Sequence, residues 1–159
     1  MKKVVLSIVC LLSAVFLIGC AGKKYTSSAI VDGLSGTIEG TVTYAPGKSL
    51  SLRIKNNSET AFSYPLTGKW EKYDGEQWVE IKLDPDMDFL VSLRLAPGES
   101  SGNTNGQHFD IANRKLEPDE KLTPGKYRVG IQITLERSGW DNSTEQERSR
   151  LVYFAFEVE

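Results

Sequence analysis

Few residues in this chain could support nucleophilic or zinc chemistry. There is one histidine, His108, in a loop rich in glycine and asparagine, and there are two cysteines, Cys10 and Cys20, both close to the N-terminus. A serine or cysteine hydrolase needs a base beside its nucleophile, usually histidine. A zinc site needs several histidine or cysteine ligands. The sequence therefore predicts neither a hydrolytic triad nor a zinc site, and we interpret His108 as a solvated loop residue.

Three aspartates have the spacing of carboxylates in a calcium-binding loop. Asp84, Asp86 and Asp88 would occupy its first, third and fifth positions. The sixth position is Phe89, where an EF-hand needs glycine, and the twelfth is Leu95, where it needs glutamate. An EF-hand is thereby excluded. A calcium site of another type is one remaining interpretation, and an acidic turn between strands is the other and the one we expect.

A second group of acids lies on a predicted hairpin. Two carboxylates at a suitable separation can hydrolyse a glycosidic bond, and the residues available here are Glu71, Asp74, Glu76 and Glu80. Because a charged strand face normally points to water, we expect these acids to be solvated. The sequence thus predicts a protein that is not an enzyme and that has no cofactor or metal site, with an ion at Asp84, Asp86 and Asp88 as the alternative left open.

Cys20 could undergo a different chemistry, the covalent attachment of lipid. A positive start is followed by an apolar run over residues 4–16, which has the length of a signal-peptide core and is shorter than the roughly 20 residues of a spanning helix. The run closes with LIGC at residues 17–20, which resembles the lipobox of bacterial lipoprotein precursors. That resemblance implies cleavage before Cys20 and a diacylglycerol on its thiol.

We therefore expect a signal peptide over residues 1–19 and a mature chain held by lipid on the extracytoplasmic face of the cell membrane. An uncleaved signal anchor is the alternative, and it leaves the domain on the same side. The whole sequence has 19 basic and 21 acidic residues, and loss of Lys2 and Lys3 leaves 17 against 21, a net charge of −4. This charge gives no reason to expect nucleic acid or an anionic lipid surface as a ligand. With no thiol beyond Cys20, the domain can form no internal disulfide and depends on its core.

The clearest structural signal is an alternation near the C-terminus. Apolar side chains occupy every second position from Tyr127 to Leu135, with Arg128, Gly130, Gln132 and Thr134 between them. Period two predicts a strand with one buried and one wet face. Burying each such side chain contributes about 1.5–3 kcal/mol, so the strand needs a second sheet over its apolar face.

Shorter runs of the same kind indicate further strands at residues 38–44, 50–55, 70–73, 77–83, 89–95 and 152–158. We expect Asn56, Asn57 and Ser58 to end the second of these, and residues 102–122 to form a long polar connection. About seven short strands, with no helical periodicity over three turns, predict an all-β, two-sheet antiparallel sandwich. We place this domain at residues 37–159. Residues 20–36 are expected to be a lipidated tether with room for an edge strand near Ile30.

The best hairpin signal is Asp74-Gly75. A two-residue loop there places Tyr73 opposite Glu76 and Trp70 opposite Val79. A four-residue loop would keep the same two faces, whereas a three-residue loop with a bulge would put Trp70 and Trp78 on one face.

In the two-residue register, Trp70, Val79 and Ile81 share a face that we assign to the core. Tyr73 and Trp78 share the other face as diagonal neighbours, surrounded by acids. Two exposed aromatic side chains in that setting suit a contact site for a peptide, a sugar or a basic surface. Tyr73 and Trp78 are therefore our candidate partner-binding residues. The alternative is that they only stabilise a cross-strand pair.

Tyr127 is preceded by Pro124 and Gly125, at the start of the penultimate strand. An immunoglobulin-like sandwich often has a corner tyrosine at this point, and its hydroxyl bonds to the backbone upstream. We expect Tyr127 to play that structural part. Val129 stands where antibody domains have a cysteine.

Four segments resemble a family of bacterial immunoglobulin-like domains found in small secreted and lipid-anchored proteins: residues 52–58 (LRIKNNS), 70–81 (WEKYDGEQWVEI), 95–100 (LAPGES) and 122–129 (LTPGKYRV). The resemblance implies an extracytoplasmic sandwich module and supplies no catalytic residue. Residues 101–113 are longer and more polar than this pattern, so the strand pairing there is left open. We expect a lipid-anchored interaction or spacer module with a protein or glycan partner; an inhibitor of an extracytoplasmic enzyme is the alternative.

Overall fold

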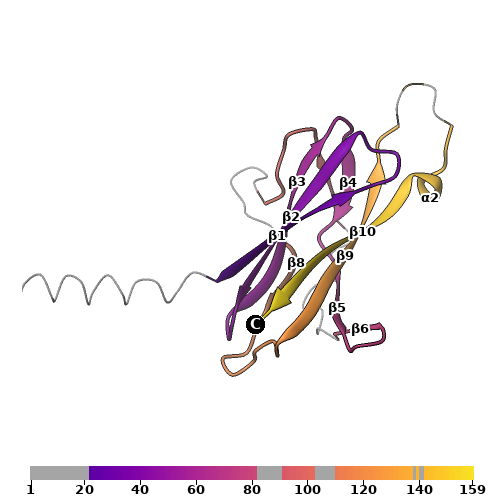
Figure 1. Cartoon of the computed structure of the whole chain (residues 1–159). Coiled ribbons are helices and arrows are strands. Elements are labelled where there is room, and N and C mark those ends of the chain that lie inside the picture. Colours follow the sequence, from indigo (N-terminus) through magenta and orange to yellow (C-terminus); the bar gives the residue numbers. More distant parts are fainter. Residues whose placement is uncertain (1–21, 82–90, 103–109, 138, 140–141) are drawn as a thin grey trace, which may run out of the picture.

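The computed structural model describes residues 22–81, 91–102, 110–137, 139 and 142–159. Within these ranges two antiparallel sheets pack face to face around one apolar core (Figure 1). The predicted all-β sandwich is confirmed, although the described residues form ten strands instead of about seven.

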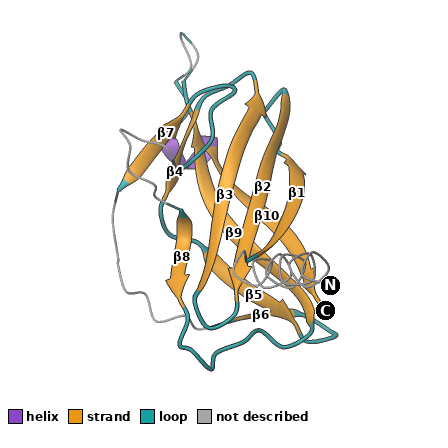
Figure 2. Cartoon of the chain, turned by 90° about the vertical axis from the view of Figure 1, so that its left-hand side faces the viewer, coloured by secondary structure: helices purple, strands orange, loops and turns teal. Residues whose placement is uncertain are grey.

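The first sheet has the strand order β1-β2-β3-β8, and Figure 2 shows β1, β2 and β3 side by side in front of β9 and β10. Its strands are β1 (Lys23–Ile30), β2 (Gly36–Ala45), β3 (Ser49–Ser58) and β8 (Ile111–Lys115).

The second sheet is organised around β9 (Gly125–Leu135). One edge of β9 pairs with β10 (Ser149–Val158) along ten residues, and the other edge pairs first with β5 and then with β4. The remaining strands of this sheet are β4 (Phe62–Pro65), β5 (Lys69–Tyr73), β6 (Trp78–Glu80) and β7 (Ser92–Leu95). A four-residue helix, α2 (Glu145–Arg148), precedes β10.

The predicted alternation of β9 places its apolar residues in the core. Tyr127, Val129, Ile131, Ile133 and Leu135 are all buried. They meet the inward side chains of β2 and β3, together with those of β10: Ile38, Val42, Tyr44, Leu50, Leu52, Ile54, Val152, Phe154, Phe156 and Val158.

Gly40, in the middle of β2, provides the space for the largest of these contacts. A Cβ added there would lie 2.2 Å from Cδ1 of Phe154. Real Cβ atoms do not approach a ring carbon so closely, so the ring of Phe154 in one sheet rests directly on the backbone of the other. The glycine in this apolar run is therefore part of the core packing.

The ordered sandwich begins earlier than expected. β1 pairs with β2 at every position from Lys23 to Ile30, and Tyr25 packs its ring against Phe156. The sandwich thus includes residues 23–30, ahead of the boundary expected at residue 37, and only residues 21 and 22 lie between Cys20 and the first strand.

β3 also continues through Asn56, Asn57 and Ser58, which were expected to end it. Asn56 is fully buried, and its side-chain amide donates to the carbonyls of Leu95 and Thr60, while its Oδ1 accepts from the backbone and side chain of Ser58. Every polar atom of this buried side chain is thus satisfied, which removes the usual cost of placing asparagine in a core strand.

Two strands were not predicted. β4 has only two inward residues, Phe62 and Tyr64. β8 lies within the segment expected to be a polar connection, and it contains a bulge because Leu50 pairs with Arg114 while Leu52 pairs with Ile111. Such an extra residue breaks the alternation by which strands are recognised.

Tyr127 occupies the corner position predicted for it. Its ring is buried, and its hydroxyl donates a 2.7 Å hydrogen bond to the carbonyl of Thr123, four residues upstream. This contact fixes the end of the loop that enters β9. Tyr25 provides a contrast, because its buried hydroxyl has no partner among the described residues.

These two tyrosines form a matched pair for a test. We expect Tyr127→Phe to lower the free energy of unfolding by about 0.5–1.5 kcal/mol, the net value of one hydrogen bond. Tyr25→Phe should be neutral or stabilising, because it removes a buried hydroxyl without a partner. Urea denaturation of both variants measures the difference, and equal effects would show that the Tyr127 hydroxyl has no corner role.

Candidate functional site

The predicted hairpin at Asp74-Gly75 is present, but its register differs from the two-residue one. Tyr73 pairs with Trp78, and Lys72 pairs with Val79, so the loop has four residues. The Asp74 carboxylate closes this loop by accepting hydrogen bonds from the backbone N–H groups of Glu76 and Gln77, both 2.9 Å. A side chain that fixes its own turn in this way selects the longer loop.

The two faces of the hairpin remain as predicted, because a four-residue loop shifts the register by an even number of residues. Tyr73 and Trp78 lie on the same side, with ring centroids 5.4 Å apart, and both are partly exposed. The core assignment was wrong for Val79, which is 45% exposed. Trp70 is buried, and its indole N–H donates to the carbonyl of Ala112 at 3.1 Å.

The aromatic pair belongs to a larger cluster on the outer side of the second sheet. The guanidinium of Arg128 in β9 lies between two rings, with its Cζ 4.4 Å from the centroid of Trp78 and 3.9 Å from that of Tyr153. Both distances are typical of cation–π contacts. Tyr73, Trp78, Arg128, Tyr153 and the neighbouring Leu151 are here called the outer aromatic face.

Tyr153 can lie flat on the sheet because Gly130 has no side chain. A Cβ added to Gly130 would lie 2.8 Å from Cε1 of Tyr153 and 3.6 Å from Cδ1 of Leu151. Tyr153 and Leu151 are nevertheless 37% and 59% exposed. The large side chains of the outer aromatic face are thus fixed in position by their neighbours and remain accessible to water.

Glu71 fixes the arginine in this cluster. Its carboxylate accepts a 2.5 Å hydrogen bond from Nε of Arg128 and lies 3.2 Å from Nζ of Lys69. The residue is almost completely buried. Burial alone would raise the pKa of Glu71, but the hydrogen bonds and charges of Arg128 and Lys69 outweigh it and hold the pKa below its usual value. The expectation that Glu71 faces water was wrong.

Two other acids of the hairpin, Glu80 and Asp74, also interact with neighbouring groups of the protein. Glu80 lies 3.3 Å from Nζ of Lys69. The backbone N–H groups of Gln77 and Glu76 lower the pKa of Asp74. A general acid in glycoside hydrolysis needs a raised pKa. Neither Glu71 nor Asp74 has one, so neither is suited to be that acid.

Several predicted residues lie outside the described ranges, namely Cys20, His108, Asp84, Asp86 and Asp88. Within those ranges, no group of three or more His, Cys, Asp or Glu residues could hold a metal ion. The described part of the chain likewise has no helix with the length and apolar character to cross a membrane.

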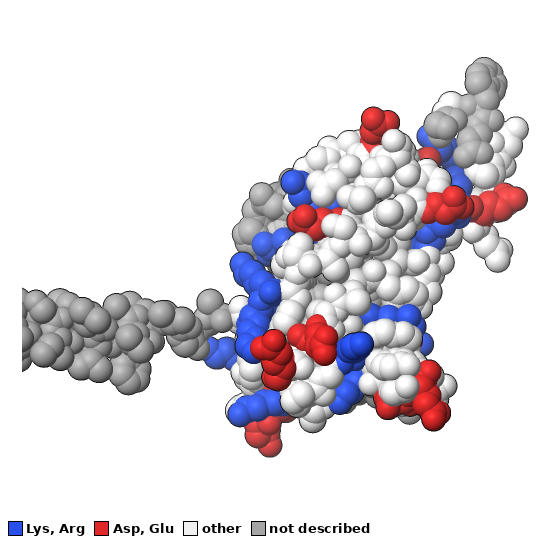
Figure 3. All heavy atoms as spheres, viewed as in Figure 1, with Lys and Arg blue, Asp and Glu red and all other residues white. Residues whose placement is uncertain are grey.

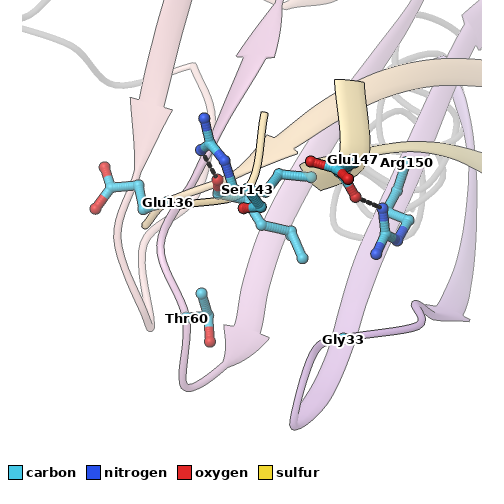
Figure 4. Close-up of a pocket in the computed structure, with 8 residues that line it drawn as sticks. Gly33, Thr60, Glu136, Ser143, Glu147 and Arg150 are labelled. Atoms are coloured by element: carbon cyan, nitrogen blue, oxygen red, sulfur yellow. Dashed lines mark hydrogen bonds between the residues drawn. The ribbon is translucent and has the colours of Figure 1, made fainter. Parts of the chain in front are cut away.

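A hollow of about 340 Å³ lies at the opposite end of the sandwich, between Gly33, Thr60 and the segment around α2 (Figure 4). The arginine side chains that line it donate hydrogen bonds to backbone carbonyl groups. Arg148 donates to the carbonyl of Leu135, and Arg150 donates to those of Asp32 and Glu147. These contacts tie α2 and the start of β10 to the two sheets. We interpret the hollow as a structural junction.

The sequence indicated Tyr73 and Trp78 but missed Arg128, Tyr153 and Leu151. Arg128 and Gly130 were recognisable as outward positions of an alternating strand. Which strands would lie beside them depends on the order β10-β9-β5-β6, which no local pattern specifies.

The lowered pKa of Glu71 gives a test of the cluster. Between its folded pKa and the ordinary carboxylate value of about 4.3, the unfolded chain binds more protons, so stability falls as the pH falls. We expect Glu71→Gln to lower the free energy of unfolding by about 1.5–3 kcal/mol at neutral pH, the value of a hydrogen bond to a charged group. Below about pH 4 the difference from wild type should shrink.

Urea denaturation over a pH series provides the measurement. Glu76→Gln is the matched control, because Glu76 is exposed on the same hairpin, and it should keep the wild-type pH profile. A constant difference between Glu71→Gln and wild type at all pH values would contradict the ion-pair assignment.

The comparisons with known proteins agree with this architecture. The Bacterial Ig-like domain family matches residues 32–148, which is well over half of the chain. No curated protein and no solved structure matches the chain. β10, which lies beyond the matched residues, completes the second sheet by pairing with β9. The chain therefore belongs to the Bacterial Ig-like domain family.

Proposed function

We propose that this protein is a lipid-anchored, non-catalytic interaction module on the extracytoplasmic face of the cell membrane. In this proposal, the outer aromatic face binds a partner protein or glycan. The observation that supports it most directly is the partly exposed cluster in which the guanidinium of Arg128 lies between the rings of Trp78 and Tyr153.

The composition of this cluster favours binding. Tryptophan, tyrosine and arginine are the residue types most enriched among the energetically dominant positions of protein interfaces. Aromatic rings also provide contact area at a low cost in conformational entropy. Here the Arg128–Glu71 contact already restrains the arginine, so a partner would not have to order it.

The non-catalytic part of the proposal is supported by how the acidic groups are used. Glu71 and Glu80 contact Lys69, and Asp74 accepts from the backbone of its own turn. The family match is to an immunoglobulin-like domain. The proposed location on the extracytoplasmic face of the membrane is supported by the sequence alone, through the apolar leader and the LIGC motif that ends at Cys20.

The lipid anchor has a direct test. We expect Cys20→Ser to abolish processing, because the thiol is the site of acylation, so that the processed form found in the detergent phase of a phase-separation assay is lost. Incorporation of a labelled fatty acid should be lost at the same time. A Cys20→Ser chain that remained processed and in the detergent phase would contradict the proposal.

The binding face is tested by cross-linking in intact cells. A photoreactive residue at Ala155, which lies opposite Arg128 on β10, should give cross-linked products that the same residue at Ser28, on the other sheet, does not. Trp78→Ala should reduce these products more than tenfold, because loss of an aromatic anchor costs about 2 kcal/mol or more of binding free energy.

Ile30→Ala is the matched control for that substitution, since Ile30 is 87% exposed but belongs to β1. It should leave the cross-links unchanged. Equal products from positions 155 and 28, or products that resist Trp78→Ala in a folded chain, would contradict binding at this face.

A further inference from the structure

One end of the sandwich lies next to the proposed lipid attachment site. The described chain starts at Gly22, two residues after Cys20, and β1 starts at Lys23. Consecutive Cα atoms are 3.8 Å apart, so the Cα of Lys23 can lie at most about 11 Å from that of Cys20. Gly22 is itself packed on β2, since a Cβ there would lie 2.9 Å from the carbonyl oxygen of Tyr44.

The other elements at this end follow from the strand pairing. Lys23 pairs with Tyr44 at the end of β2, and Ala45 pairs with Ser49 at the start of β3. The start of β9 and the C-terminus lie at the same end, where Gly125 pairs with Val158. In Figure 1 the C-terminus and the β5–β6 hairpin lie at the lower end and α2 at the upper end. This lower end is here called the base.

The base cannot move far from a bilayer to which Cys20 is attached. A ten-residue strand is about 33 Å long, so a link of about 11 Å is only a third of the length of the domain. The Debye length at physiological salt is about 8 Å. Charged groups at the base would therefore lie within reach of lipid headgroups, whereas those at the far end would be screened.

Lys23 and Lys24 are the charged residues nearest to the link, and both are exposed. Figure 3 shows basic side chains at the lower left, beside the start of the described chain, with acidic ones close by. The loop before β9 is mixed, because Glu117, Asp119 and Glu120 offset its lysines. Glu157 and Glu159, at the end of β10, add negative charge to the same end. Lys23 and Lys24 thus supply the positive charge nearest to the link, on a chain that is acidic as a whole.

We propose that the base of the sandwich rests on the membrane surface, with Lys23 and Lys24 against anionic lipid headgroups. This inference depends on the proposed lipid anchor. It fixes the direction of the domain: the β2–β3 turn faces the bilayer, and the turn after β3, with the hollow near α2, faces away.

The test compares two labelled positions at opposite ends of β3. Lys48 and Glu59 are exposed and flank the ten residues of that strand. After acylation the mature chain has no free thiol, so Lys48→Cys and Glu59→Cys each accept one fluorophore. The full chain, purified from the membrane, is placed in phosphatidylcholine and phosphatidylglycerol vesicles with nitroxide-labelled headgroups.

We expect several-fold stronger quenching at position 48 than at position 59. Equal quenching, or stronger quenching at 59, would overturn the orientation even if the chain floats with the vesicles. A chain that does not float with vesicles would overturn the anchor, and the orientation with it. Flotation and quenching therefore report the two proposals separately.

The contribution of the two lysines has its own control. Lys23→Gln with Lys24→Gln should lower the quenching at position 48 to the value seen in phosphatidylcholine alone. Lys55→Gln, an exposed lysine farther along β3, should leave it unchanged. If the double variant quenches like wild type in the anionic vesicles, the lysines do not contact headgroups.

Discussion

The alternation of β9 is the constraint on which both the core and the outer aromatic face depend. The domain has no thiol beyond Cys20, so no disulfide can join its two sheets. Their attachment instead depends on buried side chains, and β9 supplies five of them from a strand paired on both edges. Because strand residues point alternately to opposite faces, the same strand necessarily presents Arg128 and Gly130 outward. A one-residue shift would expose the core residues and bury the arginine together.

The sequence predicts those features that depend on this periodicity. It identifies the inward residues of β2, β3, β9 and β10, because period two decides them. It also separates Trp70 from Tyr73 and Trp78, provided that the hairpin loop has an even number of residues, as it has here. It fails where a strand has too few core residues, as in β4, or where a bulge interrupts the pattern, as in β8. It also fails at Asn56, where polarity indicated a strand end but long-range hydrogen bonds to Leu95 and Thr60 make burial acceptable.

Only the hairpin residues of the outer aromatic face could be predicted from the sequence, for a related reason. The hairpin aromatics are close in sequence, so they could be recognised together. Arg128 and Tyr153 come from β9 and β10, and they meet Trp78 only through the order of the strands. Glu71 shows the same limit. On its own strand it looks like a solvated acid, but the pairing of β5 with β9 places it opposite Arg128 and turns it into the buried partner that holds the arginine.

The proposed orientation constrains how a partner could use the outer aromatic face. Tyr73 and Trp78 lie near the base, since Lys72 pairs with Tyr127 close to the start of β9. Leu151 pairs with Gln132, five residues farther along that strand, which corresponds to about 17 Å. The face therefore extends along the side of the domain, from the membrane end toward the far end. A partner that covered all of it would have to lie beside the domain and close to the bilayer, whereas a partner bound only at the far end would leave the aromatic pair of the hairpin in water.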